Sequence, residues 1–229
     1  MARKLKYCPT SPYEFFNPLT TIKTKIPKWY KLTPLLNPEA NKNILPISRT
    51  VKACSPFLDA LTTGYALTLV ADIAVTQTAD GAFISWDCEQ KICDVRKPRL
   101  APPELIPAGF DPAEFIWDTN IVLEAPPGYA MLFTHPLNRP DLPFFTLSGV
   151  VDGGWSMQQG NLPFFIKQGF EGIIPMGTPF VQIIPFKVES WNSEKDLSQL
   201  EKGKINGSLT HRVSMGWYKN TYWKKKSYE

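Results

Sequence analysis

Short apolar runs, separated by turn residues about every ten positions, occupy the middle of the chain. These runs lie at 115–118, 121–124, 129–134, 144–147, 162–167 and 180–186. They are about five residues long and rich in Phe, Ile, Val and Leu, and most have Pro or Gly close to an end, which interrupts regular hydrogen bonding. Many short strands with regular turn signals are typical of a β-sandwich or barrel. The pattern therefore predicts an all-β domain.

A second block of apolar positions begins near residue 50. Residues 65–75 combine β-branched and apolar side chains, and this run predicts one long strand. Asp-Gly at 80–81 is the usual signal of a two-residue hairpin, so residues 83–86 are expected to return as its partner strand. Residues 94–113 contain five prolines and predict a loop.

The two ends of the chain have a different character. Residues 1–50 are rich in Pro, Lys, Asn and Thr and predict an extended arm that packs through Trp29 and Tyr30. Near the other end, Ser193 can cap a short helix over 194–202 that Gly203 would stop. We therefore expect an N-terminal arm over 1–50, a β domain over 51–190, and a helix with a basic-aromatic tail over 191–229.

Composition supports the all-β class by excluding other classes. The chain has 22 prolines among 229 residues, and proline is excluded from helix interiors and from central strand positions that must donate a hydrogen bond. A helical bundle, a coiled coil and a regular α/β alternation are therefore not expected. With 43% hydrophobic and 20% charged residues, the chain can bury a sizeable core.

Charge is divided unevenly along the chain. Residues 1–31 carry a net charge of +6 and residues 211–229 a net charge of +4, whereas residues 32–210 carry −6. Basic ends around an acidic middle fit two interpretations. The ends are solvated arms or arms that dock on the acidic body of a neighbouring subunit, or they bind nucleic acid or another polyanion.

Targeting and redox signals are sparse. No apolar run reaches the length of a membrane span, and no apolar stretch follows the basic residues at the start of the chain. We therefore expect no membrane partner, no secretion and a cytoplasmic location. Cys8, Cys54, Cys88 and Cys93 lack the spacing of a zinc set, so no metal site and no cofactor are expected. Reduced thiols are the default, with a Cys88–Cys93 contact as the alternative.

Four short motifs follow one another in a recognisable order. They are Thr-Gly-Tyr-Ala-Leu at 63–67, Ala-Pro-Pro-Gly-Tyr at 125–129, Gly-Val-Val-Asp-Gly-Gly-Trp at 149–155 and Gly-Thr-Pro-Phe-Val-Gln at 177–182. In this order they resemble the trimeric dUTPase and dCTP deaminase superfamily. The resemblance implies an all-β fold called the β-clip, as a distorted barrel or sandwich, and a homotrimer.

The whole chain is also similar to a family of tailed-bacteriophage and bacterial proteins. Stretches at 51–57, 133–139 and 178–186 carry this second resemblance. This resemblance implies a phage protein that is located in the host cytoplasm or in the virion. Its implied partner is a second copy of itself, another phage protein or a host protein. This resemblance implies no particular activity.

Departures from the superfamily pattern limit the chemistry that the resemblance implies. Asp152 stands where a dUTPase has the carboxylate that acts on the attacking water. The phosphate-binding Pro-Arg-Ser motif is replaced by His-Pro-Leu-Asn at 135–138, with Arg139 one residue beyond. Ala66 replaces the Asp of the first motif, and the tail lacks the glycine-rich motif that closes over a nucleotide. A deaminase would need a catalytic glutamate, for which Glu171 is the nearest candidate.

The candidate residues also have ordinary structural explanations. The candidate catalytic residue is Asp152, and the candidate ligand-binding residues are His135, Asn138, Arg139 and Gln182. Asp152 at a strand end can simply bond nearby backbone amides. In this second interpretation, His135 before a proline is a structural hydrogen-bonding group, and Gln182 on an apolar strand is the partner of a buried backbone group.

Three functional hypotheses follow. In the first, a dUTPase-like homotrimer has lost hydrolysis and serves a binding or structural role in the virion or its assembly. In the second, the protein is an active deoxynucleotide pyrophosphatase or deaminase that uses Asp152, with Mg²⁺ as its metal. In the third, aromatic and basic side chains of the tail stack on and neutralise a nucleic acid. The tail residues concerned are Tyr218, Lys219, Tyr222, Trp223, Lys224, Lys225 and Lys226.

Overall fold

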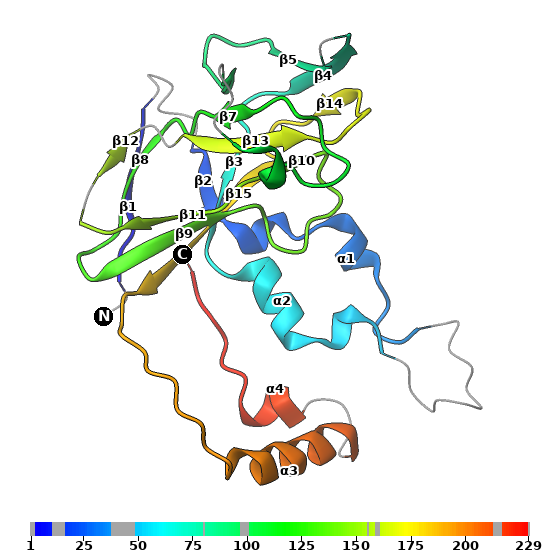
Figure 1. Ribbon diagram of the computed structural model, residues 1–229, viewed down its shortest axis with the longest axis vertical. Coiled ribbons are helices and arrows are strands. Elements are labelled where there is room, and N and C mark those ends of the chain that lie inside the picture. The colour runs from blue at the N-terminus through cyan, green and yellow to red at the C-terminus, as the bar shows by residue number, and fades with distance from the viewer. Residues whose placement is uncertain are drawn as a thin grey trace. The chain divides into compact units, whose positions relative to one another are not determined.

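The structure, a computed structural model, divides the chain into two compact units (Figure 1). The first unit comprises Met1–Ile26, Leu61–Val188 and Tyr228, and the second comprises Pro27–Ala60, Glu189–Ser227 and Glu229. The residues that the structure describes are 3–10, 17–37, 49–79, 81–96, 101–154, 156–158, 161–212 and 217–228.

Four antiparallel sheets make up the first unit, which confirms the all-β prediction. Among the described residues they do not close into a barrel. The five-stranded sheet runs in the order β11 (Gly149–Asp152), β9 (Tyr129–Thr134), β15 (Pro179–Lys187), β3 (Tyr65–Thr68) and β2 (Leu19–Thr21). The four-stranded sheet runs in the order β10 (Phe144–Thr146), β13 (Leu162–Ile166), β7 (Phe115–Trp117) and β6 (Cys93–Val95).

The other two sheets have three strands each. One runs in the order β1 (Lys6–Pro9), β8 (Ile121–Glu124) and β12 (Met157–Gln158), and the other β14 (Gly172–Ile174), β4 (Ile73–Thr78) and β5 (Gly81–Trp86). Short 3-10 helices are η1 (Ile22–Lys25), η2 (Val51–Ala53) and η3 (Pro103–Leu105). Strands β1 and β2 lie in the region predicted as an arm, and each pairs with a strand from later in the chain.

An aromatic stack forms the centre of the core. The Trp117 ring lies 3.6 Å from the Phe164 ring, centroid to centroid, and also contacts Phe144 and Phe180. Its indole nitrogen donates to Thr146 Oγ1 at 3.0 Å, and that hydroxyl donates to the Phe180 carbonyl oxygen at 2.8 Å. A partner of this kind is usual for the N–H of a buried tryptophan. The stack therefore joins strands of the four-stranded and five-stranded sheets.

The strand predicted over 65–75 is wrong as a single element. It divides into β3 and β4, which belong to different sheets. At the bend, the Leu69 amide donates to the Thr178 carbonyl oxygen, and the Asp72 carboxylate accepts from the Met176 amide. These bonds to the turn before β15 redirect the chain, and an apolar sequence alone carries no sign of them. The predicted hairpin pairing of β4 with β5 is present, although Asp80 lies outside the described residues.

Helices of the second unit differ in part from the prediction. They are α1 (Lys28–Leu32), α2 (Ser55–Thr62), which continues into the first unit, α3 (Gln199–Arg212) and α4 (Trp217–Thr221). The helix predicted over 194–202 instead begins at Gln199, because Asp196 rather than Ser193 accepts from the Ser198 amide and the Gln199 side chain. Gly203 does not stop it, since a glycine inside a helix costs only about 1 kcal/mol.

Aromatic packing connects α1 to α2. Trp29 and Tyr30 contact each other and both contact Phe57, with Tyr30 stacked on Phe57 at 6.0 Å. The Lys52 ammonium donates to the Tyr30 carbonyl oxygen at 2.8 Å and to that of Lys31, and so stabilises the end of α1. The two predicted packing anchors of the N-terminal region therefore pack against α2.

The cysteines are free thiols. Cys8, Cys54 and Cys88 are exposed, while Cys93 is buried on β6, where burial raises the pKa of its thiol to about 12. No group of three potential metal-ligating side chains occurs within the described residues. Within that same part of the chain, no helix has both the length and the apolar character needed to cross a membrane.

Candidate functional site

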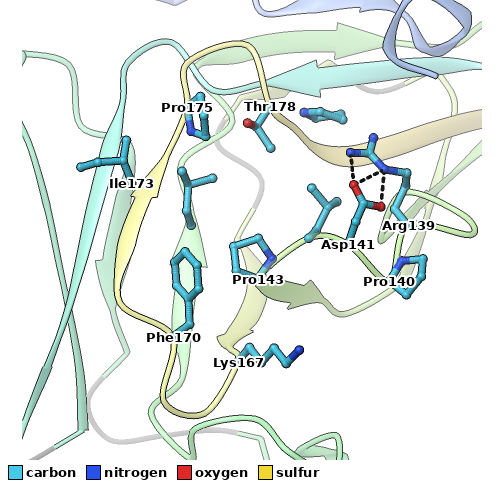
Figure 2. Close-up of a pocket in the computed structure, with 12 residues that line it drawn as sticks. Arg139, Pro140, Asp141, Pro143, Lys167, Phe170, Ile173, Pro175 and Thr178 are labelled. Carbon is cyan, nitrogen blue, oxygen red and sulfur yellow. Dashed lines mark hydrogen bonds and ion pairs between the residues drawn. The ribbon is translucent and has the colours of Figure 1, made fainter. Parts of the chain in front are cut away.

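A cleft of about 440 Å³ lies beside the turn that joins β9 to β10. Figure 2 shows the Arg139–Asp141 pair on one side of it, Ile173 and Phe170 on the other, and Lys167 between the two sides at one end. Three stretches of the first unit line the cleft, namely 139–143, 167–170 and 173–179. We call it the 139–143 cleft.

Gln182 holds the turn in place from the centre of β15. It lies opposite Thr134 on β9 and Ala66 on β3, and its side chain is fully buried. Its amide oxygen accepts from the Leu137 amide at 2.8 Å, and its amide nitrogen donates to the Thr63 carbonyl oxygen at 2.7 Å. Gln182 therefore satisfies buried backbone groups, as one of the two sequence interpretations expected, and does not line the cleft.

Arg139 lines the cleft, and Asn138 precedes it in the same turn. Asn138 has a φ of 57°, a left-handed conformation that asparagine tolerates better than most residues. The Arg139 guanidinium donates to both oxygens of Asp141, with Nε–Oδ1 and Nη2–Oδ2 distances of 2.9 Å. Its Nη1 also donates to the Lys25 carbonyl oxygen at 3.2 Å. Arg139 is thus held rigidly by contacts within its own chain.

His135 lies behind the turn rather than in the cleft. Its ring stacks on Phe145 at 5.0 Å, its Nε2 lies 3.2 Å from the Arg139 carbonyl oxygen, and its Nδ1 lies 3.4 Å from the Thr146 amide. If Nδ1 accepts from that amide, Nε2 carries the proton and donates to Arg139, which makes the ring neutral. Burial lowers the pKa of His135 in agreement with that state. The geometry suits a structural group better than a general base.

The buried imidazole predicts a pH dependence of stability. Because burial lowers the folded-state pKa of His135, the unfolded chain takes up a proton near pH 6.5 while the folded chain does not. The contribution of His135 is therefore complete above about pH 6.5 and is lost as pH falls through the folded-state pKa, with a slope of at most about 1.4 kcal/mol per pH unit.

Urea unfolding at about pH 7.5 and about pH 5 measures this contribution. The free energy of unfolding of the wild type is expected to fall further between these values than that of His135→Gln, since the carboxylates titrate alike in both proteins. An equal fall in the two proteins would contradict the prediction.

The cleft has more cationic than anionic groups. Arg139 and Lys167 line it together with one carboxylate, that of Asp141. The Lys25 ammonium lies close by, 3.6 Å from the position that a Cβ on Gly177 would occupy. Phe170, Ile173 and the cleft prolines add an apolar wall. Such a lining suits a small anion with an apolar or planar body.

Sequence reasoning identified Arg139 but missed Lys167, Asp141 and Phe170. No spacing in the sequence predicts that the loop after β13 faces the turn after β9. The connection is the pairing of β10 with β13, which places Phe144 opposite Ile166 and brings the ends of both strands together. The Lys167 amide then donates to the Pro143 carbonyl oxygen at 2.8 Å.

Asp152 lies away from the other candidate residues within one chain. It pairs with Ala130 on β9. His135 follows Ala130 by five positions, which corresponds to a separation of roughly 17 Å along an extended strand. After Asp152, the Gly153 amide donates to the Tyr129 carbonyl oxygen and the Gly154 amide to that of Ala125. The Asp-Gly-Gly sequence and the Pro-Pro-Gly-Tyr turn are thus two sides of one packed corner; Trp155 lies outside the described residues.

The tail residues belong to the second unit, apart from the cleft residues in sequence. Trp223 and Lys226 both contact Asp59 on α2, whereas Tyr218 and Tyr222 are exposed. Lys219, Lys224 and Lys225 are exposed as well. The side chain of His211 lies outside the described residues.

Comparison with known proteins gives a loose structural likeness. No family model matches the chain, and a search of curated proteins finds no match. Among solved structures, a mutant dUTPase from phage phi11 of S. aureus superposes with a TM-score of 0.27 at 14% identity. The match covers 47% of this chain and 97% of the dUTPase chain. A likeness this loose assigns no role to any residue.

Proposed function

We propose that this protein is a phage-type, dUTPase-like homo-oligomer that binds a small anion in the 139–143 cleft without hydrolysing it. We further propose that it serves the virion or its assembly. One observation carries the loss of hydrolysis. Arg139 follows the segment that replaces the phosphate motif, and its guanidinium is held by Asp141 and by the Lys25 carbonyl oxygen of its own chain. A polyphosphate hydrolase needs free donors at its reacting centre.

An exposed apolar strip supports self-association. Val150 on the edge strand β11 is 61% exposed and pairs with Leu132, which in turn pairs with Ile184 on β15. Further along β15, Phe186 is also exposed. An edge strand with apolar side chains on one face is a hazard for a monomer, and a second copy of the chain would cover it.

Turnover of deoxynucleotides tests the loss of hydrolysis. With Mg²⁺ and each common deoxynucleoside triphosphate, including dUTP, we expect the wild type to release no more product than Asp152→Asn. Turnover that disappears in Asp152→Asn would contradict the proposal and establish the hydrolase hypothesis. Light scattering at micromolar concentration is expected to give a multiple of 25.9 kDa, and a strict monomer would contradict the oligomer.

Calorimetric titration with dUTP and with inorganic pyrophosphate tests the cleft. We expect Lys167→Ala to weaken binding about tenfold, as for the loss of one charge-assisted contact. Lys4→Ala removes the same charge at an exposed position of the same unit and is expected to leave the affinity unchanged. Equal weakening in both variants, or no binding by the wild type, would contradict a site in this cleft.

A further inference from the structure

The positive charge of the protein is concentrated in the second unit. That unit contains 13 Lys and Arg residues against 7 Asp and Glu, a net charge of +6, whereas the first unit has a net charge of −2. A small unit with this excess attracts polyanions over several ångströms, since the attraction is screened only beyond about 8–10 Å at physiological salt. The 139–143 cleft, in the first unit, does not account for this charge.

Two tyrosines of the second unit, Tyr218 and Tyr222, are exposed at the end of α4. The Tyr218 carbonyl oxygen accepts from the amides of both Tyr222 and Trp223 at 2.9 Å, and these bonds end α4. Tyr218 lies within α4, and Tyr222 is the first residue after it. They are 42% and 54% exposed. Large aromatic side chains left on the surface of a charged unit are available to a partner.

Asp59 anchors the segment that follows these tyrosines. Its carboxylate accepts from the Trp223 indole nitrogen at 2.9 Å and from the Lys226 ammonium at 2.5 Å. The chain between these two anchors carries Lys224 and Lys225, both exposed. In the part of the chain that the structure describes, no carboxylate pairs with Lys219, Lys224 or Lys225. Asp59 therefore anchors the tail on α2 and neutralises only one of its lysines.

We propose that Tyr218, Lys219, Tyr222, Lys224 and Lys225 form a binding surface for single-stranded nucleic acid. Bases stack on exposed aromatic rings, and neighbouring ammonium groups neutralise the phosphates, which is the usual mode of sequence-tolerant single-strand binding. A duplex shields its base faces and would use the lysines alone. Trp223 and Lys226 act as anchors rather than contacts, because Asp59 already engages both.

Fluorescence anisotropy of a labelled oligothymidylate of about 20 nucleotides tests this surface. At about 50 mM salt the wild type is expected to bind, with an association constant that falls as salt rises. The double variant Lys224→Ala/Lys225→Ala is expected to bind at least tenfold more weakly. Its negative slope of log K against log salt is expected to be shallower by about 1.4. The double variant Tyr218→Ala/Tyr222→Ala is expected to lose tenfold or more with the slope unchanged.

Three controls keep the result interpretable. Lys195→Ala/Lys202→Ala removes the same charge from exposed positions of the same unit and is expected to change the affinity less than twofold. Tyr218→Phe/Tyr222→Phe retains the rings and is expected to bind like the wild type. Circular dichroism confirms that each variant is folded.

The proposal would be overturned by the absence of binding at low salt, by equal losses in the two lysine pairs, or by an unchanged affinity in the tyrosine-to-alanine variant. Stronger binding to vesicles with about one-third anionic lipid than to the oligonucleotide would also overturn it, in favour of a membrane surface. These outcomes are independent of the deoxynucleotide and pyrophosphate titrations, which concern the first unit.

Discussion

Gly64→Ala is expected to leave little folded protein. Gly64 joins α2 to β3 with a φ of +84°, and a Cβ there would lie 2.1 Å from the Ile183 carbonyl oxygen and 3.3 Å from the Ile184 Cα. Both contacts are with backbone of the central strand β15, which cannot move without breaking its pairing with β9 and β3. We expect a loss of more than about 4 kcal/mol in the free energy of unfolding, measured by urea denaturation followed by circular dichroism.

Gly169→Ala separates the clash from the cost of the backbone conformation. Gly169 has a similar φ of +70°, but no heavy atom lies within 4 Å of the position its Cβ would take. Alanine there carries only the left-handed strain, about 1–2 kcal/mol. If both variants lose the same stability, the close approach of Gly64 to Ile183 is not the reason that residue 64 must be glycine.

Backbone packing explains why the four sequence motifs occur together. Residues 63–67 and 177–182 are neighbours because β3 pairs with β15, and residues 125–129 and 149–154 are neighbours because their backbones form one corner. Gly153 has no room for a Cβ, which would lie 2.5 Å from two carbonyl oxygens of that turn. These motifs can thus be explained by packing, without a catalytic role for Asp152.

Strand positions could be predicted where an apolar run forms a single strand of one sheet. They could not be predicted where an apolar run passes from one sheet into another. The runs at 129–134 and 180–186 correspond closely to β9 and β15, because apolar content and flanking prolines are local signals. The bend between β3 and β4 depends on Leu69 and Asp72 bonding to a turn more than 100 positions later in the chain. A contact at that separation leaves no periodic trace in the sequence.

Only one residue that lines the candidate site, Arg139, could be identified from the sequence. Arg139 stood out because it follows an altered phosphate motif, but the sequence could not show that Asp141 occupies its guanidinium. Likewise, Gln182 on an apolar strand indicated a buried polar group without identifying Leu137 and Thr63 as its partners. Chemistry-bearing residues can be identified locally, whereas their availability depends on tertiary contacts.

Glu114→Ala is expected to be the most destabilising change of a charged residue. Glu114 is only 2% exposed, and its carboxylate accepts from Arg96 Nη1 at 3.2 Å and from the Ala101 amide at 2.7 Å. Alanine leaves a guanidinium and a buried N–H without their acceptor. Breaking a buried pair in this way costs about 3–5 kcal/mol, which corresponds to a melting temperature roughly 10 °C lower in a chain of this size.

Glu114→Gln and Asp94→Ala identify which part of that loss comes from burial. Glutamine keeps an oxygen that the Ala101 amide can use and removes only the charge, so its loss should be smaller than that of alanine. Asp94 also forms an ion pair, with Lys91 at 2.6 Å, but both side chains are about half exposed. Because water solvates both ions of an exposed pair after separation, Asp94→Ala is expected to leave the melting temperature unchanged within measurement. A loss in Asp94→Ala as large as that in Glu114→Ala would show that charge pairing in general, rather than the buried acceptor of Glu114, stabilises this unit.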